Sequence, residues 1–193
     1  LARICSKVGQ ALIPPLKQAT AVWVETNFYL PPEAGARPGP YNLDYVPYMK
    51  GIYAALDDPK VLEVVAQKAS QIGWTYGLLG WLCKLIAVDS TVIILMFPTE
   101  RTARQFNDEK FVPSVRATPA MAKIIDVTKS RSTDNRALFK SFPGGFLKLI
   151  TARSISDLKG TTARIVIAEE PDDALDNVSG QGDAITNLYE RTK

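Results

Sequence analysis

A β-branched run leads directly into a glycine turn in the stretch Val61-Leu-Glu-Val-Val-Ala-Gln-Lys68-Ala-Ser-Gln-Ile-Gly73-Trp-Thr75, and this stretch indicates the fold class. Residues 61–67 are short and mostly apolar, which predicts a buried parallel strand. Residues 75–87 are apolar almost all round and predict a buried helix. A strand, a loop and a helix in this order are typical of an α/β sheet with a ligand at the carboxyl ends of its strands.

The rest of the chain continues the alternation of strands and helices. A second buried strand is expected at residues 91–97, and a helix with Thr99 as N-cap of a capping box at residues 99–115. Residues 137–140 and 146–151 predict strands joined by a turn at Pro143-Gly-Gly145, and residues 164–168 predict another buried strand. The pattern predicts a mostly parallel central sheet flanked by helices.

The first sixty residues differ from this core. They contain a predicted helix over residues 8–24 that is interrupted at two prolines, a Pro/Gly-rich connector over 30–41, and a second helix over 45–56. We therefore expect a helical and extended lead-in over residues 1–60 and a core domain over residues 61–193. The chain starts without Met and without a secretory signal, so we expect a fragment of a longer protein.

Composition limits the chemistry that this chain can perform. It has 193 residues, of which 46% are hydrophobic and 22% charged, and it contains no histidine. Without histidine, His-based triads and His-ligated metals are excluded, so a metal must be held by oxygen atoms. The two cysteines lie far apart, which favours a reducing cytosol, and no apolar run is long enough to cross a membrane.

Charge is unevenly distributed along the chain. The net charge is +3, but residues 101–164 carry 13 basic and 5 acidic side chains, whereas residues 165–193 carry 2 and 7. The middle block can meet phosphate and the acidic end can hold a hard cation. On charge alone, a solvated helix face followed by an acidic loop explains the pattern better, and the motifs below change that balance.

Residues 68–75 are a variant of a phosphate-binding loop. The usual pattern, G-x-x-x-x-G-K-[ST], keeps here its second glycine at Gly73 and its hydroxyl at Thr75. Lys68 stands at the position of the first glycine, from where its flexible stem can reach the phosphates, and Trp74 occupies the usual lysine position. Trp74 either packs against the loop or forms a wall beside the nucleotide. The alternative is that Lys68 is a surface lysine before an ordinary strand-to-helix turn and binds no phosphate.

Two adjacent carboxylates, Glu169 and Glu170, follow the strand expected at residues 164–168. In nucleoside triphosphatases, the first acid at this place orders Mg²⁺ and its waters, and the second polarises the attacking water. The alternative is the start of an acidic loop that continues through Asp172, Asp173 and Asp176. The phosphate loop and the paired acids together favour the triphosphatase.

The pattern Lys68-x₄-Gly73-aromatic-Thr75 resembles the variant Walker A motif of large terminase subunits in the lambda-like GpA family. The segment Ser154-x-Ser-Asp-Leu-Lys159-Gly160 before the acidic strand end is similar to the segment before that family's Walker B motif. Trp23, the run at residues 29–31 and the aromatic-rich residues 41–53 are similar to its N-terminal lead-in. The resemblance covers most of residues 20–175.

This resemblance implies an ASCE-type P-loop ATPase domain that drives double-stranded DNA into a procapsid. The implied cofactors are ATP and Mg²⁺, and the implied partners are double-stranded DNA, the small terminase subunit, the portal protein and further copies in a ring. The protein would act in the host cytoplasm and transiently on the viral procapsid, without contacting a membrane. The family's nuclease domain would lie beyond residue 193, so no DNA cleavage is expected from this fragment.

The resemblance also implies roles for individual residues. Glu169 and Glu170 would be catalytic, and Thr75 with Glu169 would hold the metal, although Glu169 stands where the family usually has Asp. Tyr48 or Tyr45 would pack on adenine. A trans-acting cation would be Lys159, with Arg153 and Arg164 as rivals. The remaining nucleotide contacts would come from Lys68, Ala69, Ser70, Gln71, Ile72, Gly73, Trp74 and Thr75, and DNA contacts from Arg131, Arg136, Lys140 and Lys148.

Two other functions remain open at this stage. Because the lysine is displaced and Glu169 is unusual, the chain could instead be a catalytically degenerate P-loop module that binds DNA or portal without efficient hydrolysis. A helicase-like ATPase is a more distant alternative, and it would require a second motor domain downstream.

Overall fold

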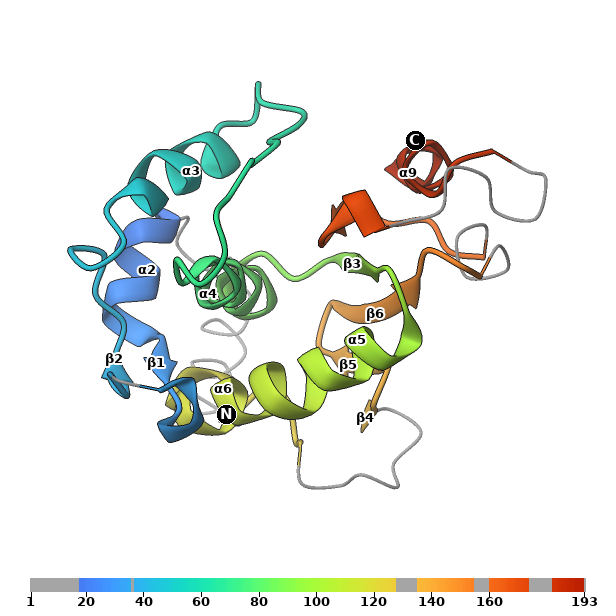
Figure 1. The fold of residues 1–193 in the computed structure, drawn as a ribbon. Coiled ribbons are helices and arrows are strands. Elements are labelled where there is room, and N and C mark those ends of the chain that lie inside the picture. The colour runs from blue at the N-terminus through green and yellow to red at the C-terminus, as the bar shows by residue number, and fades with distance from the viewer. Residues whose placement is uncertain (1–17, 36, 128–134, 155–159, 174–181, 193) are drawn as a thin grey trace, which may run out of the picture.

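A five-stranded mixed sheet forms the centre of the protein in the computed structural model, which describes residues 18–35, 37–127, 135–154, 160–173 and 182–192 (Figure 1). The strand order is β4-β5-β6-β3-β7. β3 is parallel to β6 and to β7, whereas β4, β5 and β6 form an antiparallel meander. The described sheet is therefore mixed: it is parallel over β6, β3 and β7, whereas a mostly parallel sheet was predicted, and β5 and β4 extend it in antiparallel fashion. The strands are β3 (Val92–Phe97), β4 (Asn135–Arg136), β5 (Phe139–Phe142), β6 (Gly145–Thr151) and β7 (Ile165–Ala168).

β3 is the central strand, and its side chains are buried on both faces. Ile93 and Leu95 join a large apolar core with the helices, whereas Ile94 and Met96 face a smaller core completed by Leu188. This division follows from the two-residue period of a strand, which sends successive side chains to opposite faces. Because β6, β3 and β7 are parallel, their carboxyl ends lie at the same edge of the sheet.

The helices agree largely with the sequence pattern. The helix expected at residues 75–87 is present as α4, and the capping box at Thr99 and Thr102 is formed at the start of α5. Within the described residues, no helix has both the length and the apolar character that crossing a membrane requires. The helices are α2 (Thr20–Asn27), α3 (Tyr48–Asp57), α4 (Trp74–Val88), α5 (Glu100–Phe106), the π-helical turn η2 (Asn107–Phe111), α6 (Val112–Ala117), α7 (Pro119–Ala122) and α9 (Ala184–Tyr189). Shorter elements are β1 (Tyr29–Leu30) paired with β2 (Gly39–Pro40), and the 3₁₀ turns η1 (Pro32–Ala34), η3 (Pro171–Asp173) and η4 (Glu190–Thr192).

The strand predicted for residues 61–67 is wrong. This segment has no regular secondary structure, and Leu62 and Val65 are 97% and 83% exposed. β-Branched residues stabilise a strand only through contacts with neighbouring strands, and no described strand pairs with this segment. The segment instead runs outside the sheet from α3 to α4 (Figure 1).

The lead-in packs tightly against α4. A Cβ atom added to Gly77 would lie 2.9 Å from the sulfur of Met49, and one added to Gly80 would lie 3.0 Å from Val24. The Tyr53 hydroxyl donates a hydrogen bond of 2.7 Å to the carbonyl oxygen of Gly77. Lead-in and α4 therefore share one apolar core, while a division into two domains at residue 60 stays a prediction.

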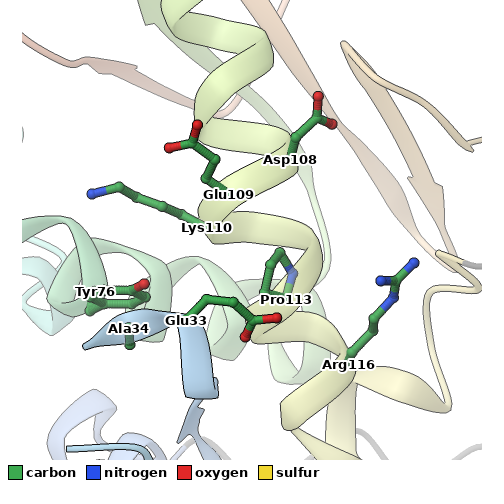
Figure 2. A pocket seen from close by; sticks show the side chains of 8 residues that line it. All are labelled: Glu33, Ala34, Tyr76, Asp108, Glu109, Lys110, Pro113 and Arg116. Atoms are coloured by element: carbon green, nitrogen blue, oxygen red, sulfur yellow. The ribbon is translucent and has the colours of Figure 1, made fainter. Parts of the chain in front are cut away.

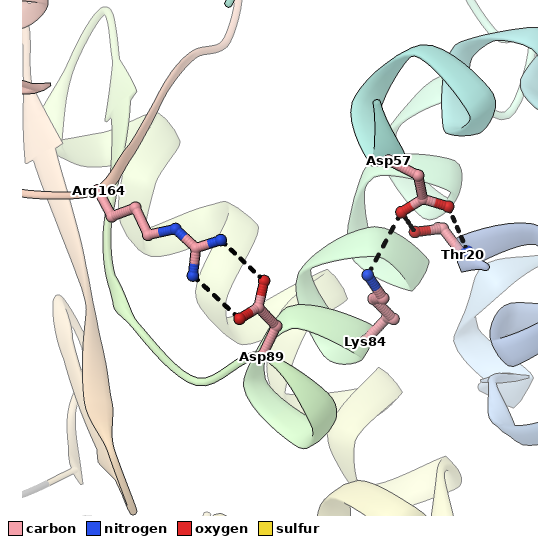
Figure 3. Close-up of polar contacts among 5 residues, drawn as sticks. All are labelled: Thr20, Asp57, Lys84, Asp89 and Arg164. Atoms are coloured by element: carbon pink, nitrogen blue, oxygen red, sulfur yellow. Dashed lines mark hydrogen bonds and ion pairs between the residues drawn. The ribbon is translucent and has the colours of Figure 1, made fainter. Parts of the chain in front are cut away.

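Two carboxylates hold the ends of these elements together (Figure 3). Asp57, the last residue of α3, accepts hydrogen bonds of 2.6 Å from both the backbone N–H and the hydroxyl of Thr20, and one of 3.3 Å from Lys84. Asp89, after α4, accepts two hydrogen bonds of 2.9 and 3.0 Å from the guanidinium of Arg164. The second pair ties the start of β7 to the end of α4.

Gly145 offers a direct test of the sheet register. A Cβ atom at this residue would collide with the backbone carbonyl of Thr91, which has no flexible end that could move away. We expect Gly145→Ala to lower the free energy of unfolding by about 1–3 kcal/mol, as overpacking does. Gly51→Ala is the matched control, because it lies on α3 with open space around it and should stabilise by ~0.5–1 kcal/mol. Urea unfolding followed by tryptophan fluorescence measures both, and equal stability of the two variants would contradict the described packing.

Candidate active site

A tight turn connects Lys68 to the start of α4. Gln71 has a φ of 58° and Gly73 a φ of 85°, so two residues of this loop adopt left-handed backbone conformations. At Gly73, the N-cap of α4, this conformation favours glycine, and a Cβ atom would also lie 3.3 Å from Val46. Left-handed residues just before a helix turn backbone N–H groups toward a common point, which is the geometry of anion-binding loops.

The N-terminus of α4 has no side-chain cap, because its N-cap residue is Gly73. The helix has 15 residues, and no side chain at its N-cap forms a capping hydrogen bond. The first backbone N–H groups of a helix have no intrahelical acceptor, and the helix dipole favours negative charge beside them. Thr75 lies in this first turn and is half-buried. The loop and the helix start thus satisfy the physical requirements of a phosphate site.

The two acids lie at the end of β7. The backbone N–H of Glu169 donates to the carbonyl oxygen of Met96 at 3.0 Å, so Glu169 still belongs to the sheet edge. Glu170 has a φ of 52°, and the chain turns sharply at this residue. Glu169 is 8% exposed, whereas Glu170 is exposed. The turn allows two adjacent carboxylates, which would point to opposite faces in a strand, to border one site.

Side chains of the loop contact both acids. The indole N–H of Trp74 donates a hydrogen bond of 3.0 Å to Oε1 of Glu169. The ammonium nitrogen of Lys68 lies 3.9 Å from Oε1 of Glu170. The structure therefore brings together the two motifs that lie a hundred residues apart in the sequence. Trp74, at the position of the usual lysine, binds an acid of the other motif.

Burial dominates the electrostatics of Glu169. Loss of solvent raises its pKa above the ordinary value of 4.5, and the negative charge of Glu170 adds to this effect. The positive charge of Lys68, the hydrogen bond from Trp74 and the charge of Lys110 act in the opposite direction. The net result is a raised pKa, so the native fold holds a carboxylate that a cation would stabilise.

The two candidate tyrosines have different surroundings. The Tyr48 hydroxyl donates a hydrogen bond of 2.7 Å to the carbonyl oxygen of Ile72, which places this ring beside the loop. Tyr45 is 64% exposed, and the guanidinium of Arg37 lies 3.9 Å from its ring centre. Of the two side chains, Tyr48 is the one that borders the loop. The loop residues Ala69, Ser70 and Gln71 are exposed.

The candidate trans-acting cations occupy different ends of the sheet. Arg153 is exposed and follows the carboxyl end of β6, the same sheet edge as Glu169. Arg164 precedes β7 and is bound to Asp89 at the opposite end. Lys159 lies outside the described residues.

The candidate DNA contacts include one that requires correction. Lys140 is 3% exposed, its ammonium donates to the carbonyl oxygen of Arg136 at 2.7 Å, and burial lowers its pKa. Its charge is therefore inside the protein and does not face a DNA backbone. Arg136 is exposed on β4, Lys148 is half-buried on β6, and Arg131 lies outside the described residues.

Sequence reasoning missed a pocket next to the site (Figure 2). It has a volume of about 550 Å³ and lies between η1, the first turn of α4 and the π-helical turn η2. Lys110 extends from η2 over Tyr76, with its ammonium 5.6 Å from the ring centre. The sequence does contain an indication of the π-helical turn, because Phe106 and Phe111 are five residues apart and do not both fit the apolar stripe of an α-helix. The lining residues are Glu33, Ala34, Tyr76, Asp108, Glu109, Lys110, Pro113 and Arg116.

Comparison with known proteins identifies the family of this chain. A model of the family described as "Phage terminase large subunit gpA, ATPase domain" matches residues 35–193. The chain belongs to this family. The resemblance to terminase large subunits of the lambda-like type is thereby confirmed.

Two curated relatives are similar to this terminase ATPase domain. The "Terminase, large subunit" of Enterobacteria phage P21 is 28% identical over 135 residues, and that of Escherichia phage lambda is 24% identical over 136 residues. Each match covers 70% of this chain and 21% of the relative, so the chain spans about a fifth of the length of these relatives. No solved structure matches the chain.

The raised pKa of Glu169 makes a prediction about stability. A carboxyl whose pKa is higher in the native state binds more protons there than in the unfolded state, so this group lowers stability as pH rises above 4.5. Glu169→Gln removes this effect and retains an acceptor for Trp74. We expect the variant to be more stable than the wild type at neutral pH, with the difference shrinking toward pH 4.5.

Urea unfolding of the ligand-free domain at several pH values measures this effect. Asp172→Asn serves as the control, because it neutralises an exposed acid near the same turn. A Glu169→Gln variant that is less stable than the wild type at neutral pH would show that this carboxylate stabilises the ligand-free fold.

Proposed function

We propose that this domain hydrolyses ATP and powers the packaging of double-stranded DNA by a terminase, with the active site at the carboxyl edge of an ASCE-type P-loop sheet. The observation that carries the proposal is the convergence of Lys68, Trp74 and the two acids at the end of β7. The family match supports the same chemistry, since its description names an ATPase domain.

The triphosphate would lie in the turn before α4. Backbone N–H groups of the loop and of the first helical turn offer hydrogen bonds to phosphate oxygens. Lys68 would add a positive charge from the start of the loop. Its ammonium is 3.9 Å from Glu170, beyond ordinary hydrogen-bond length, so it remains able to bind a phosphate. Tyr48, which already borders the loop at Ile72, would pack on the adenine.

The donor set fits Mg²⁺. This cation prefers oxygen ligands, and Glu169 presents a carboxylate of which one oxygen accepts from Trp74, while no hydrogen bond to the other is formed by the residues that the structure describes. Glu169 and the hydroxyl of Thr75 would hold the ion, and in that position it would neutralise charge on the β- and γ-phosphates. Burial of Glu169 would strengthen its attraction for a cation, because the carboxylate has little water to lose.

Glu170 would act as the general base. It is exposed at the sharp turn after Glu169, so water has access to it. The carboxylate would accept a proton from a water molecule as the water oxygen bonds to the γ-phosphorus and the bond to the bridging oxygen breaks, giving ADP and phosphate. Lys68, beside Glu170, would be close to both the phosphate and the base.

The motor function adds partners to this chemistry. Terminase large subunits would work as a ring on the portal, with the small subunit and double-stranded DNA, in the host cytoplasm. The excess of positive charge over residues 101–164 supports contact with a DNA backbone, and of the described candidates Arg136 and Lys148 remain after Lys140 is removed.

Arg153 at the active edge and Lys159 are the better trans-acting cations, because Arg164 is held by Asp89. We expect no nuclease activity from residues 1–193.

One observation favours a second candidate function. Both acids already contact the loop, Glu169 through Trp74 and Glu170 through Lys68. If these contacts persist when nucleotide is present, the acids are occupied and the domain is a degenerate module that binds DNA or portal without efficient hydrolysis.

Substitution of the loop lysine and of the base separates these candidates. We expect Lys68→Ala to weaken binding of a fluorescent ATP analogue by about tenfold or more, since a charge-assisted contact to phosphate is lost. Lys60→Ala, at an exposed lysine of the same connecting segment, should bind normally. Glu170→Gln should retain binding and lose ~10²–10⁴-fold in hydrolysis rate.

Hydrolysis is measured as phosphate release by the full-length terminase with DNA. Normal affinity of Lys68→Ala would exclude the proposed site. Normal binding by the wild type without any phosphate release would favour the degenerate module.

A further inference from the structure

A π-helical turn interrupts an otherwise α-helical segment next to the site. Phe106 and Phe111 lie five residues apart, yet both are buried, and their ring centres are 6.5 Å apart. In a regular α-helix, five residues differ by about 140° in direction, so one of the two rings would point away from the core. The turn Asn107–Phe111 widens the helix and brings both rings to the same side.

This widening also sets the position of Lys110. The residue directly precedes the buried Phe111, and its half-buried side chain extends over the ring of Tyr76 (Figure 2). Tyr76 lies in the first turn of α4, next to Thr75. The charge of Lys110 also reaches Glu169, where it acts together with that of Lys68. Two lysines from distant parts of the chain therefore both lower the pKa of the same buried carboxylate.

Lys110 retains its capacity to bind an anion. Among the described residues, no carboxylate forms an ion pair with it, although Asp108 and Glu109 are its neighbours in sequence. Its contact with the Tyr76 ring uses the face of the π-system and leaves the ammonium protons free for hydrogen bonds. The aromatic ring holds the long side chain in one direction, toward the start of α4.

We propose that Lys110 is a second cation of the ATP site, which contacts the terminal phosphate from the π-helical turn, over the ring of Tyr76. This inference rests on the function proposed above and names a residue outside both motifs. In an ordinary phosphate loop the lysine directly follows the glycine, but here Trp74 fills that position and binds Glu169. Lys68 approaches from the loop and Lys110 from the π-helical turn, so together they replace a single lysine.

The role predicts a difference between ATP and ADP. Lys110 lies over Tyr76, next to Thr75, and Thr75 would hold the ion that neutralises the β- and γ-phosphates, so loss of Lys110 should weaken binding of the triphosphate and spare the diphosphate. We expect Lys110→Met to lower affinity for a fluorescent ATP analogue about tenfold and to change affinity for the matching ADP analogue less than about twofold. Lys110→Arg, which keeps the charge, should restore most of the ATP affinity.

The controls separate this inference from the proposed function. Lys123→Met removes an exposed lysine after α7 and should bind both nucleotides like the wild type. Thermal melting of every variant checks that the fold is kept. If the wild type binds neither analogue, the proposed function fails and the inference fails with it. If the wild type binds ATP and Lys110→Met behaves like Lys123→Met, or loses ATP and ADP affinity equally, Lys110 does not contact the terminal phosphate and the inference alone is overturned.

Discussion

The contact between the glycine loop and the end of β7 is the constraint on which the site depends. A buried carboxylate at a strand end is costly unless polar groups compensate it; Trp74 donates a hydrogen bond to Glu169, and the positive charge of Lys68 lowers its pKa. The loop in turn is held because Gly73 takes a left-handed conformation and starts α4. Strand pairing with β3 fixes Glu169 at the sheet edge. Each part of the site therefore depends on a different element of the fold, and no single local motif supplies the whole site.

The lead-in contributes to the same constraint from the other side of α4. Its helices fit against two helical glycines, and Asp57 joins the ends of α2, α3 and α4 through Thr20 and Lys84. This packing positions Tyr48, whose hydroxyl binds the loop at Ile72. A nucleotide in the loop would thus contact a segment that is far from the loop in sequence. The lead-in therefore packs against α4 and borders the proposed site through Tyr48.

The sequence predicts those features that depend on local pattern. The apolar runs at residues 75–87 and 91–97 and the capping box at Thr99 need no knowledge of distant residues, and they form as expected. The strand predicted at residues 164–168 forms at 165–168, but it is a half-buried edge strand of the described sheet and not a buried one. Residues 61–67 have an equally good strand pattern, but a strand also needs a partner edge, which local pattern does not report. Lys110 and Lys140 show the same limit, because a π-helical turn decides the direction of the first and a neighbouring carbonyl oxygen binds the second.

Covalent labelling of lysine by an acyl phosphate of ATP can show whether Lys68 lies at a triphosphate site, since the acyl group transfers to amines that lie beside the bound phosphates. Mass spectrometry of the digested protein then identifies the labelled residues. We expect rapid labelling of Lys68 that excess Mg-ATP suppresses, and slow, unprotected labelling of the exposed Lys60 on the same segment. Labelling of Lys68 at the rate of Lys60, without protection by Mg-ATP, would contradict a triphosphate site between the loop and the two acids.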